Sequence, residues 1–250
     1  MKMIYEKSQG AQPRYLLLFG RPSYDDRGIE GSCKLYVPNY QSATTLNEMS
    51  LRSNDDYFGI LDDEDGEGSY GMVDVAVGRF PVSSESQAKI AVDKTIQYAS
   101  RDIVGSGTSY CNFGSWKNII TFVGDDEDGT SHVAAADLAA TTAENANPDI
   151  NAEKIYLDAY EQVTYSSSAR YPEVTKAINN RMNAGCLLIA YFGHGGKNGW
   201  AHERIIELTD ITKWANRYNQ PWMVTLTCEL GWYDRALVSP AELAFLNANG

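Results

Sequence analysis

The chain alternates short apolar runs with amphipathic stretches, a pattern typical of α/β proteins. Strands are expected at residues 15–19, 73–78, 119–123, 154–157, 186–192 and 222–227, and the first two are expected to be buried. Helices are expected at residues 85–100, 132–145, 171–184, 211–218 and 240–246, where apolar side chains recur at helical spacing. Strands that alternate with helices predict an α/β fold with a doubly wound, mostly parallel sheet and helices on both faces.

Two subdomains are expected within the 250 residues. The run Gly105-Ser106-Gly107 is a flexible break between the two halves of the pattern. We therefore predict an N-terminal α/β subdomain at residues 1–112 and a second subdomain at residues 113–250. The second half shows the more regular alternation and is the better candidate for a functional site.

Composition and charge exclude several classes of protein. Hydrophobic residues make up 43% of the chain and charged residues 22%, an ordinary globular balance. The net charge of -12 disfavours binding to nucleic acid or to anionic lipid. No apolar run approaches the roughly 20 residues that span a bilayer. The start of the chain is polar and does not resemble a signal peptide.

The four cysteines fit neither a zinc site nor a disulfide framework by their spacing. Cys186 opens an apolar run and is expected to be a small buried side chain. Cys33 and Cys111 lie in polar sequence, and whether they form a disulfide stays open. Cys228 differs from the others, because it directly follows a predicted strand.

A histidine and a cysteine follow two successive strands of the predicted sheet. The strand at 186–192 leads into Gly193-His194-Gly195-Gly196, and the strand at 222–227 leads into Cys228. The two residues are 34 positions apart (228 − 194), the length of one crossover unit. Functional groups of a parallel sheet gather beyond the carboxyl ends of its strands, so we expect both side chains at one edge.

This pair is suited to nucleophilic catalysis. A thiol attacks as its thiolate, and a nearby imidazole accepts the proton or stabilises the ion pair. The backbone amides of Gly195 and Cys228 are the expected oxyanion donors. Each residue alone has a more ordinary interpretation, a core cysteine or a turn histidine. On these residues alone, catalysis and a structural role remain even alternatives.

The segments around this pair resemble the caspase-like (clan CD) cysteine peptidases, and among them the gingipain family. Residues 191–196 (YFGHGG), with Trp200 shortly after, are similar to the catalytic-histidine segment of that family. Residues 227–234 (TCELGWYD) are similar to its nucleophile segment. Three further segments, at residues 15–20, 55–59 and 77–82, are closest to the PorU-type members, the C-terminal signal peptidases of type IX secretion in Bacteroidota.

The resemblance covers nearly the whole chain and implies a caspase-like fold and a cysteine endopeptidase. The expected reaction passes through an acyl-enzyme, with His194 as base and Cys228 as nucleophile, and needs no cofactor. The implied substrate is secreted cargo with a C-terminal sorting domain, and resolution by an amine would make the enzyme sortase-like. The implied partners are type IX secretion components, at the outer-membrane surface.

The sequence also departs from the family. The arginine- and lysine-cleaving gingipains bind a basic side chain beside the cut bond, but no matching specificity acid is evident here. The chain starts inside the family's domain and stops at Asn249-Gly250, where relatives continue. We therefore expect an excised catalytic region that is truncated at its C-terminus.

Acidic residues offer weaker signals. The acids at 125–128 follow a predicted strand, so one of them, with Asp126 as the first choice, or else Asp137, is a candidate to orient His194. Asp62, Asp63 and Asp65 are a candidate for structural calcium, although their spacing is not that of an EF-hand. A solvated acidic loop is the favoured alternative in both places.

Aromatic residues and the other histidines are also ambiguous. Trp200 and Trp232 flank the motif segments and are candidates to line a substrate pocket, with core packing as the alternative. His132 and His202 are expected to be structural or exposed, and His202 is the main rival to His194 as base.

Two other functions remain open. A binding or scaffold module of a secretion complex would keep the same fold without turnover. A small-molecule α/β enzyme would need a Gly-rich phosphate loop after the first strand, and Gly20-Arg21-Pro22-Ser23 does not supply one.

Overall fold

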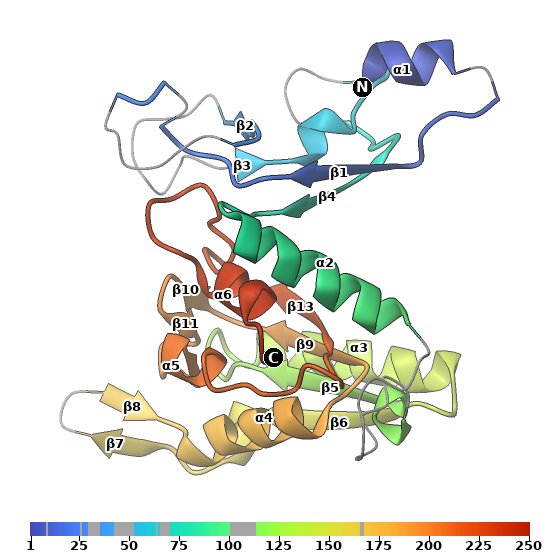
Figure 1. The fold of residues 1–250 in the computed structure, drawn as a ribbon. Helices are drawn as coiled ribbons and strands as arrows, with labels where there is room; N and C mark the ends of the chain where they lie inside the picture. Colours follow the sequence, from blue (N-terminus) through green and yellow to red (C-terminus); the bar gives the residue numbers. More distant parts are fainter. Residues whose placement is uncertain are drawn as a thin grey trace, which may run out of the picture. The chain divides into compact units, whose positions relative to one another are not determined.

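The computed structural model describes residues 1–8, 10–25, 27–29, 36–42, 53–63, 65, 71–100, 114–165 and 168–250. The chain divides into two compact units (Figure 1). Unit 1 contains Met1–Ala91 and Trp232–Val238, and unit 2 contains Val92–Gly231 and Ser239–Gly250. The boundary that we predict at residue 112 falls in residues 101–113, outside the described residues, and stays a prediction.

Unit 2 is built on a parallel four-stranded sheet of order β13-β9-β5-β6 (Figure 1). The strands are β5 (Ile119–Gly124), β6 (Asn151–Tyr156), β9 (Leu188–Phe192) and β13 (Trp222–Leu226). The chain runs from β5 outward to β6 and then returns past β5 to β9. This reversal makes the gap between β5 and β9 the topological switch point, where α/β sheets place their ligand sites.

Helices cover both faces of this sheet, as the sequence predicts. On one face, α4 (Pro172–Ala184) buries side chains at i, i+4 and i+8, namely Val174, Ile178 and Met182. They join a core with Val123, Ile155, Ile189 and Tyr191. On the other face, α3 (Ser131–Ala146) buries Ala136 and Ala140 against Phe122 and Ala190. Alternate residues of β5 and β9 therefore point to opposite helices, as the two-residue period of a strand requires.

The smaller elements of unit 2 lie mainly at the carboxyl end of the sheet. A three-stranded antiparallel sheet contains β10 (Gly195–Gly196), β11 (Gly199–Trp200) and β12 (Ile206–Glu207). A hairpin pairs β7 (Val163–Tyr165) with β8 (Ser168–Arg170). The 3-10 turns η2 (Ser115–Asn118) and η3 (Leu157–Ala159) precede β5 and follow β6.

One predicted helix is wrong. The structure has a short helix, α5 (Leu208–Ile211), and turns over 212–218. Glu207 and Asp210 form a reciprocal capping box that fixes the helix start at Leu208. The last helix, α6 (Pro240–Leu246), has the predicted bounds, and Ser239 and Glu242 cap it in the same way.

Unit 1 pairs β1 (Tyr15–Phe19) with β4 (Ala76–Phe80) in parallel. The observed β4 begins later than the strand predicted at residues 73–78. Unit 1 also contains α1 (Lys2–Lys7), β2 (Tyr40–Gln41), β3 (Ser53–Asn54) and the 3-10 turn η1 (Asp56–Phe58). The helix α2 (Glu85–Ala99) begins after Ser84, whose hydroxyl caps the amide of Gln87, and continues into unit 2.

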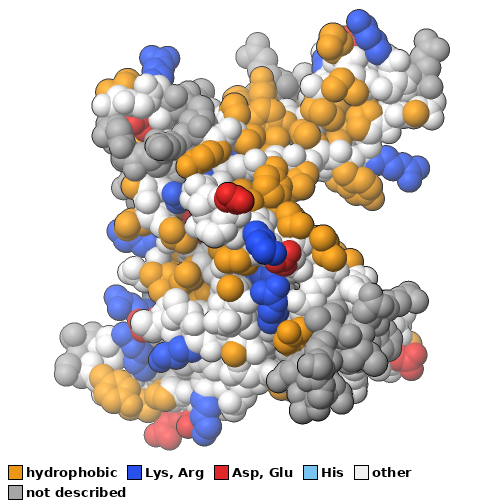
Figure 2. Space-filling view, in the orientation of Figure 1, with side chains coloured by type: hydrophobic (Ala, Val, Ile, Leu, Met, Phe, Trp, Pro, Cys, Tyr) orange, Lys and Arg blue, Asp and Glu red, His pale blue; other side chains and the backbone are white. Residues whose placement is uncertain are grey.

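Exposed apolar side chains are a feature of unit 1. They include Met3 and Ile4 of α1 and Tyr15, Leu17 and Phe19 of β1, so the prediction that the strand at residues 15–19 is buried is wrong. Figure 2 shows hydrophobic side chains gathered over the part of unit 1 that contains β1 and α1. Among the described residues, no helix has the length and apolarity to cross a membrane.

Arg79 joins the separate segments of unit 1. Its guanidinium binds both oxygens of the Asp55 carboxylate, at 2.6 and 2.7 Å. It also donates to the carbonyl oxygens of Gly20, Val37 and Pro38. The side chain of Arg79 is 4% exposed and that of Asp55 14% exposed. The bidentate geometry and the burial make this ion pair a central contact of unit 1.

We predict that Arg79→Leu lowers the free energy of unfolding by about 3–5 kcal/mol, because it leaves the Asp55 carboxylate buried and unpaired. The matched control is Lys176→Leu, which breaks the exposed pair of Lys176 and Glu173 and should cost about 0.5 kcal/mol or less. Urea unfolding followed by circular dichroism measures both. Equal losses in the two variants would contradict the role assigned to Arg79.

Candidate active site

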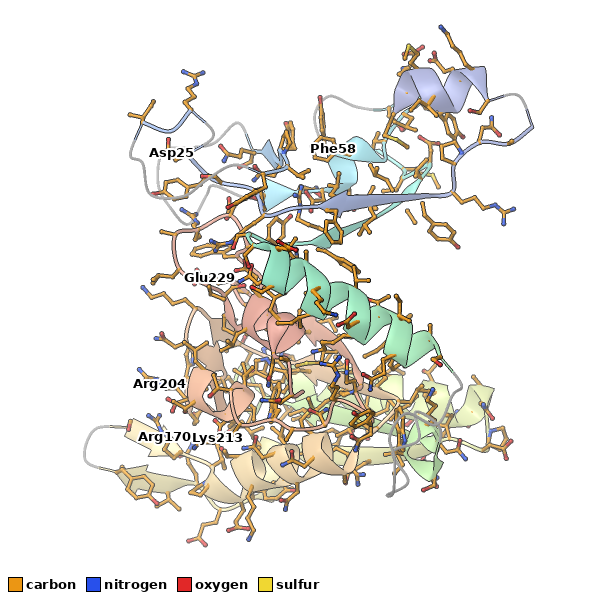
Figure 3. The ribbon with its side chains drawn as sticks, viewed as in Figure 1. Asp25, Phe58, Arg170, Arg204, Lys213 and Glu229 are labelled. Carbon is orange, nitrogen blue, oxygen red and sulfur yellow. The ribbon has the colours of Figure 1, made fainter. Side chains whose placement is uncertain are left out.

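The register of the sheet places the ends of three strands level with one another. Gly124 of β5 pairs with Phe192 of β9, and Phe192 pairs with Leu226 of β13. His194 lies two residues beyond Phe192, and Cys228 lies two residues beyond Leu226. The prediction that neighbouring parallel strands bring both segments to one edge is therefore confirmed. Figure 3 marks this edge with Glu229, which directly follows Cys228.

The glycines that flank His194 allow this segment to approach the segment of Cys228 closely. The amide of Gly193 donates to the carbonyl of Leu226 at 3.3 Å. A Cβ on Gly195 would overlap Thr227 Oγ1 and would lie 3.3 Å from the carbonyl oxygen of Cys228. A larger residue at this position would push the histidine segment away from the cysteine segment.

Cys228 is exposed, whereas Cys186 is buried. Burial raises the pKa of the Cys186 thiol to about 11, so this cysteine stays protonated and unreactive, as the sequence predicts. Glu229, directly after Cys228, has a φ of +57°, a conformation that non-glycine residues rarely adopt. Strained backbone of this kind concentrates at functional sites. Cys33 and Cys111 lie outside the described residues.

The backbone of His194 is held on both sides. Its amide donates to Asp125 Oδ2 at 2.8 Å. Its carbonyl accepts from the Tyr191 hydroxyl at 2.6 Å and from the amide of Ala201 at 2.8 Å. Burial and the Asp125 carboxylate raise the pKa of Tyr191 far above its usual value, so its hydroxyl remains a donor. The position of the imidazole is therefore fixed through the main chain.

The three histidines of the chain lie together at this edge, which the sequence does not predict. The ring of His194 stacks on that of His202 with centroids 4.8 Å apart, and its edge meets the ring of His132 at 5.2 Å. Asp128 Oδ2 lies 3.2 Å from His194 Nε2 and 3.4 Å from His132 Nε2. The i, i+4 spacing of Asp128 and His132 is the only sequence signal for this cluster.

The acid beside the His194 ring is Asp128, one of the four acids at residues 125–128, and not the preferred candidates Asp126 and Asp137. Asp126 accepts from the Tyr171 hydroxyl at 2.6 Å. Asp137, on α3, is bound by Lys154 and by the Tyr156 hydroxyl, and these contacts lower its pKa. Asp128 lies beside the ring in their place, in a loop where Asp128 and Thr130 both have positive φ angles. The sequence pattern does not specify such a turn.

The two tryptophans that the sequence suggests for a substrate pocket, Trp200 and Trp232, belong to different units. Trp200 is 2% exposed and stacks on Tyr191 in the core, with ring centroids 4.5 Å apart. It also lines a cavity of about 480 Å³ in unit 2, together with Met182, Trp214, Met223, Leu230 and Phe245. The lining does not include His194 or Cys228. Trp232 lies in unit 1 against the Arg235 guanidinium. A substrate-binding role for either tryptophan stays a prediction.

The calcium site expected at Asp62, Asp63 and Asp65 is not tested, because residues 64 and 66–70 lie outside the described residues. Asp63 forms an ion pair with Lys2. The oxyanion role of the Gly195 and Cys228 amides also stays a prediction.

The comparisons with known proteins assign the chain to a family. The model of peptidase family C25 matches residues 1–250. The chain belongs to this family. It is 24% identical over 216 residues to gingipain R2 of Porphyromonas gingivalis, a match that covers 85% of this chain and 26% of the relative. Gingipain R1 of the same species is also 24% identical, with 19% of its length covered.

Solved structures confirm the caspase-like α/β fold of this C25 chain. The Arg-specific cysteine proteinase gingipain R matches with a TM-score of 0.65 and 20% identity, over 98% of this chain and 47% of that one. The solved structure of another protease matches with a TM-score of 0.64 and 14% identity, over 99% of this chain and 46% of that one. The chain thus spans about a quarter or less of these curated relatives and about half of the solved chains.

We predict that Gly195→Ala lowers the free energy of unfolding by about 1–3 kcal/mol, because the new methyl group overlaps Thr227. Gly196→Ala is the matched control, since a Cβ there would lie 3.8 Å from Glu229 Oε2, an ordinary contact. Thermal unfolding of the two variants measures the difference. Equal destabilisation would mean that the two segments are not packed as described.

Proposed function

We propose that this chain carries the catalytic centre of a cysteine endopeptidase, with Cys228 as nucleophile and His194 as general base. The observation that carries the proposal is the level register of β9 and β13, which brings the two residues to one edge of the sheet. Membership of peptidase family C25 supports the same reaction class. The exposure of Cys228 leaves its thiol open to a substrate.

The proposed reaction has two steps. The Cys228 thiol gives its proton to His194, and Sγ attacks the peptide carbonyl. The C–N bond breaks as His194 protonates the leaving amine, which leaves an acyl group on Sγ. Water or another amine then attacks the acyl carbon and releases the thiol. Asp128 acts as a positioning residue through its contact with His194 Nε2.

We predict that iodoacetamide alkylates Cys228 quickly near pH 6 and that His194→Ala removes this reactivity, because the imidazole stabilises the thiolate. Cys186 provides an internal control and should stay unmodified while the fold is intact. Peptide mapping by mass spectrometry gives the rate at each cysteine. An ordinary thiol profile in both proteins would favour the second candidate function, a scaffold that keeps the fold without turnover.

We further propose that the whole protein removes C-terminal sorting domains from type IX secretion cargo at the outer-membrane surface, in contact with secretion components. The resemblance of residues 15–20, 55–59 and 77–82 to PorU-type peptidases supports this assignment. An acyl-enzyme that accepts an amine would transfer the trimmed cargo, for example to a lipopolysaccharide amine, as well as hydrolyse it.

We predict that a reporter protein fused to a sorting domain is cleaved at the domain junction, and that Cys228→Ala abolishes the cleavage. With an added primary amine, the new C-terminus should carry that amine as an amide, which mass spectrometry detects. If the new C-terminus is a free carboxylate at every amine concentration, the acyl-enzyme is hydrolysed and the proposed transfer to an amine is wrong. A reporter that stays intact while Cys228 is reactive would contradict the sorting-domain substrate alone.

A further inference from the structure

Three side chains with metal-binding atoms converge at the edge of the sheet that carries His194. Asp128 lies in the loop after β5, His132 in the first turn of α3, and His194 in the loop after β9. Asp128 Oδ2 lies 3.2 Å from His194 Nε2 and 3.4 Å from His132 Nε2. One ligand atom of each residue lies within 4.8 Å of those of the other two. Two loops that are distant in sequence thus bring two imidazoles and one carboxylate together.

The spacing of these atoms is that of a small coordination shell. Zinc bonds to histidine nitrogen and carboxylate oxygen are about 2.0–2.2 Å long, so two ligands of a tetrahedral ion are about 3.3–3.6 Å apart. The two distances from Asp128 Oδ2 are close to this range. The rings of His132 and His194 meet edge-on, at an interplanar angle of 79°. Both Nε2 atoms therefore face the same carboxylate oxygen.

Hydrogen bonds alone do not account for this arrangement. His132 Nε2 is buried and has no hydrogen-bond partner within the described part of the chain, although Asp128 lies nearby. A buried polar atom without a partner is rare and calls for a bound water or ion. The Asp128 side chain is 60% exposed, so an ion can reach the cluster from solvent.

We propose that Asp128, His132 and His194 bind a divalent transition-metal ion, with Zn²⁺ as the expected ion. Two imidazoles and one carboxylate are a known ligand set for zinc in proteins, with the fourth position left to water. Imidazole nitrogen suits Zn²⁺, Cu²⁺ and Ni²⁺, whereas Ca²⁺ and Mg²⁺ prefer oxygen ligands. The donor set therefore selects against the hard cations, and Cu²⁺ is the expected competitor.

The ion would inactivate the proposed general base. A neutral imidazole has one nitrogen that accepts a proton and one that carries a proton. When a metal ion binds Nε2 of His194, the other nitrogen carries the proton. The ring can then neither take the proton of the Cys228 thiol nor return it to the leaving amine. Zn²⁺ would thus be a reversible inhibitor, and this consequence rests on the proposed function, whereas binding of the ion does not.

His132 is the ligand to remove in a test, because the proposed reaction does not use it. The experiment measures Zn²⁺ binding by calorimetry to protein that carries no histidine tag and has been freed of metal with a chelator. The wild-type chain should bind Zn²⁺, and the ion should raise its melting temperature. His132→Ala should weaken binding about tenfold or more, because loss of a group that merely orients a metal ligand already costs that much. Absence of Zn²⁺ binding to the wild type, or equal affinity in both proteins, would overturn the proposal.

Two controls locate the ion. His202→Ala removes the third histidine, which stacks on His194 but is not one of the three ligands, and should leave Zn²⁺ affinity unchanged. Cys228→Ala should also leave it unchanged, and loss of binding in this variant would place the ion on the thiolate and overturn the proposal. If His132→Ala does not fold, Asp128→Asn replaces it and should weaken binding for the same reason, since Asn tolerates the φ of +58° found at this position.

Inhibition is tested separately, through cleavage of casein as an unstructured protein substrate. Zn²⁺ should inhibit the wild type, and His132→Ala should need about tenfold or more Zn²⁺ for the same inhibition. Zn²⁺ that binds through His132 without slowing cleavage would overturn the inhibitory role. A Cys228 that is inert toward iodoacetamide in the absence of Zn²⁺ contradicts the proposed function alone, because calorimetry still decides the metal site.

Discussion

The structure depends above all on the register between β5, β9 and β13. Three parallel strands end at the paired positions Gly124, Phe192 and Leu226, so the loops that follow them start at one level. A slip of one residue would turn every side chain of a strand to the opposite face and destroy both helix-packed cores. The requirement to bury these cores therefore also sets the position of the site. Packing and proposed chemistry are specified by the same hydrophobic pattern.

Beyond this edge of the sheet, backbone hydrogen bonds do most to position His194. The amide and the carbonyl of His194 are both engaged, whereas its ring meets other side chains. Asp125 is buried where an uncompensated charge is costly, and it accepts a backbone hydrogen bond there. The arrangement fixes the direction of the loop and leaves the imidazole at the surface. A general base needs this combination of a fixed position and access to substrate.

The sequence predicts the order of these strands well because each apolar run marks a strand, although β13 is less buried than β5 and β9. The strands that precede His194 and Cys228 are recognisable as largely hydrophobic segments, and their order along the chain implies a shared edge. The helix predicted at residues 211–218 is wrong because the helix starts earlier, at the capping box of Glu207 and Asp210, and the chain has turns over 212–218. The sequence indicates the acidic run at residues 125–128 but not that Asp128 is the member beside the His194 ring, because this choice depends on the conformation of a loop with positive φ at Asp128 and Thr130. Pattern analysis cannot find contacts that depend on loop conformation or on chain segments distant in sequence.

The division of the chain into two units also depends on segments that are distant in sequence. Trp232–Val238 begins inside the segment at residues 227–234 that contains Cys228, but it belongs to unit 1. The amide of Tyr24 donates to the carbonyl of Asp234, and Arg21 donates to the carbonyls of Arg235 and Leu237. Residues Gly20, Asp55 and Arg79, which are also distant in sequence, meet in unit 1, where Arg79 binds the Asp55 carboxylate and the carbonyl of Gly20.

The gathering of all three histidines at one edge has a practical consequence for spectroscopy. The chain has no other imidazole, and His132, His194 and His202 share ring contacts. Every imidazole resonance in a nuclear magnetic resonance spectrum of this chain therefore originates within the candidate site. Ring-current shifts between the stacked and edge-on rings would make those few signals sensitive to small movements of the loop. These imidazole signals therefore report on the candidate site without any added label.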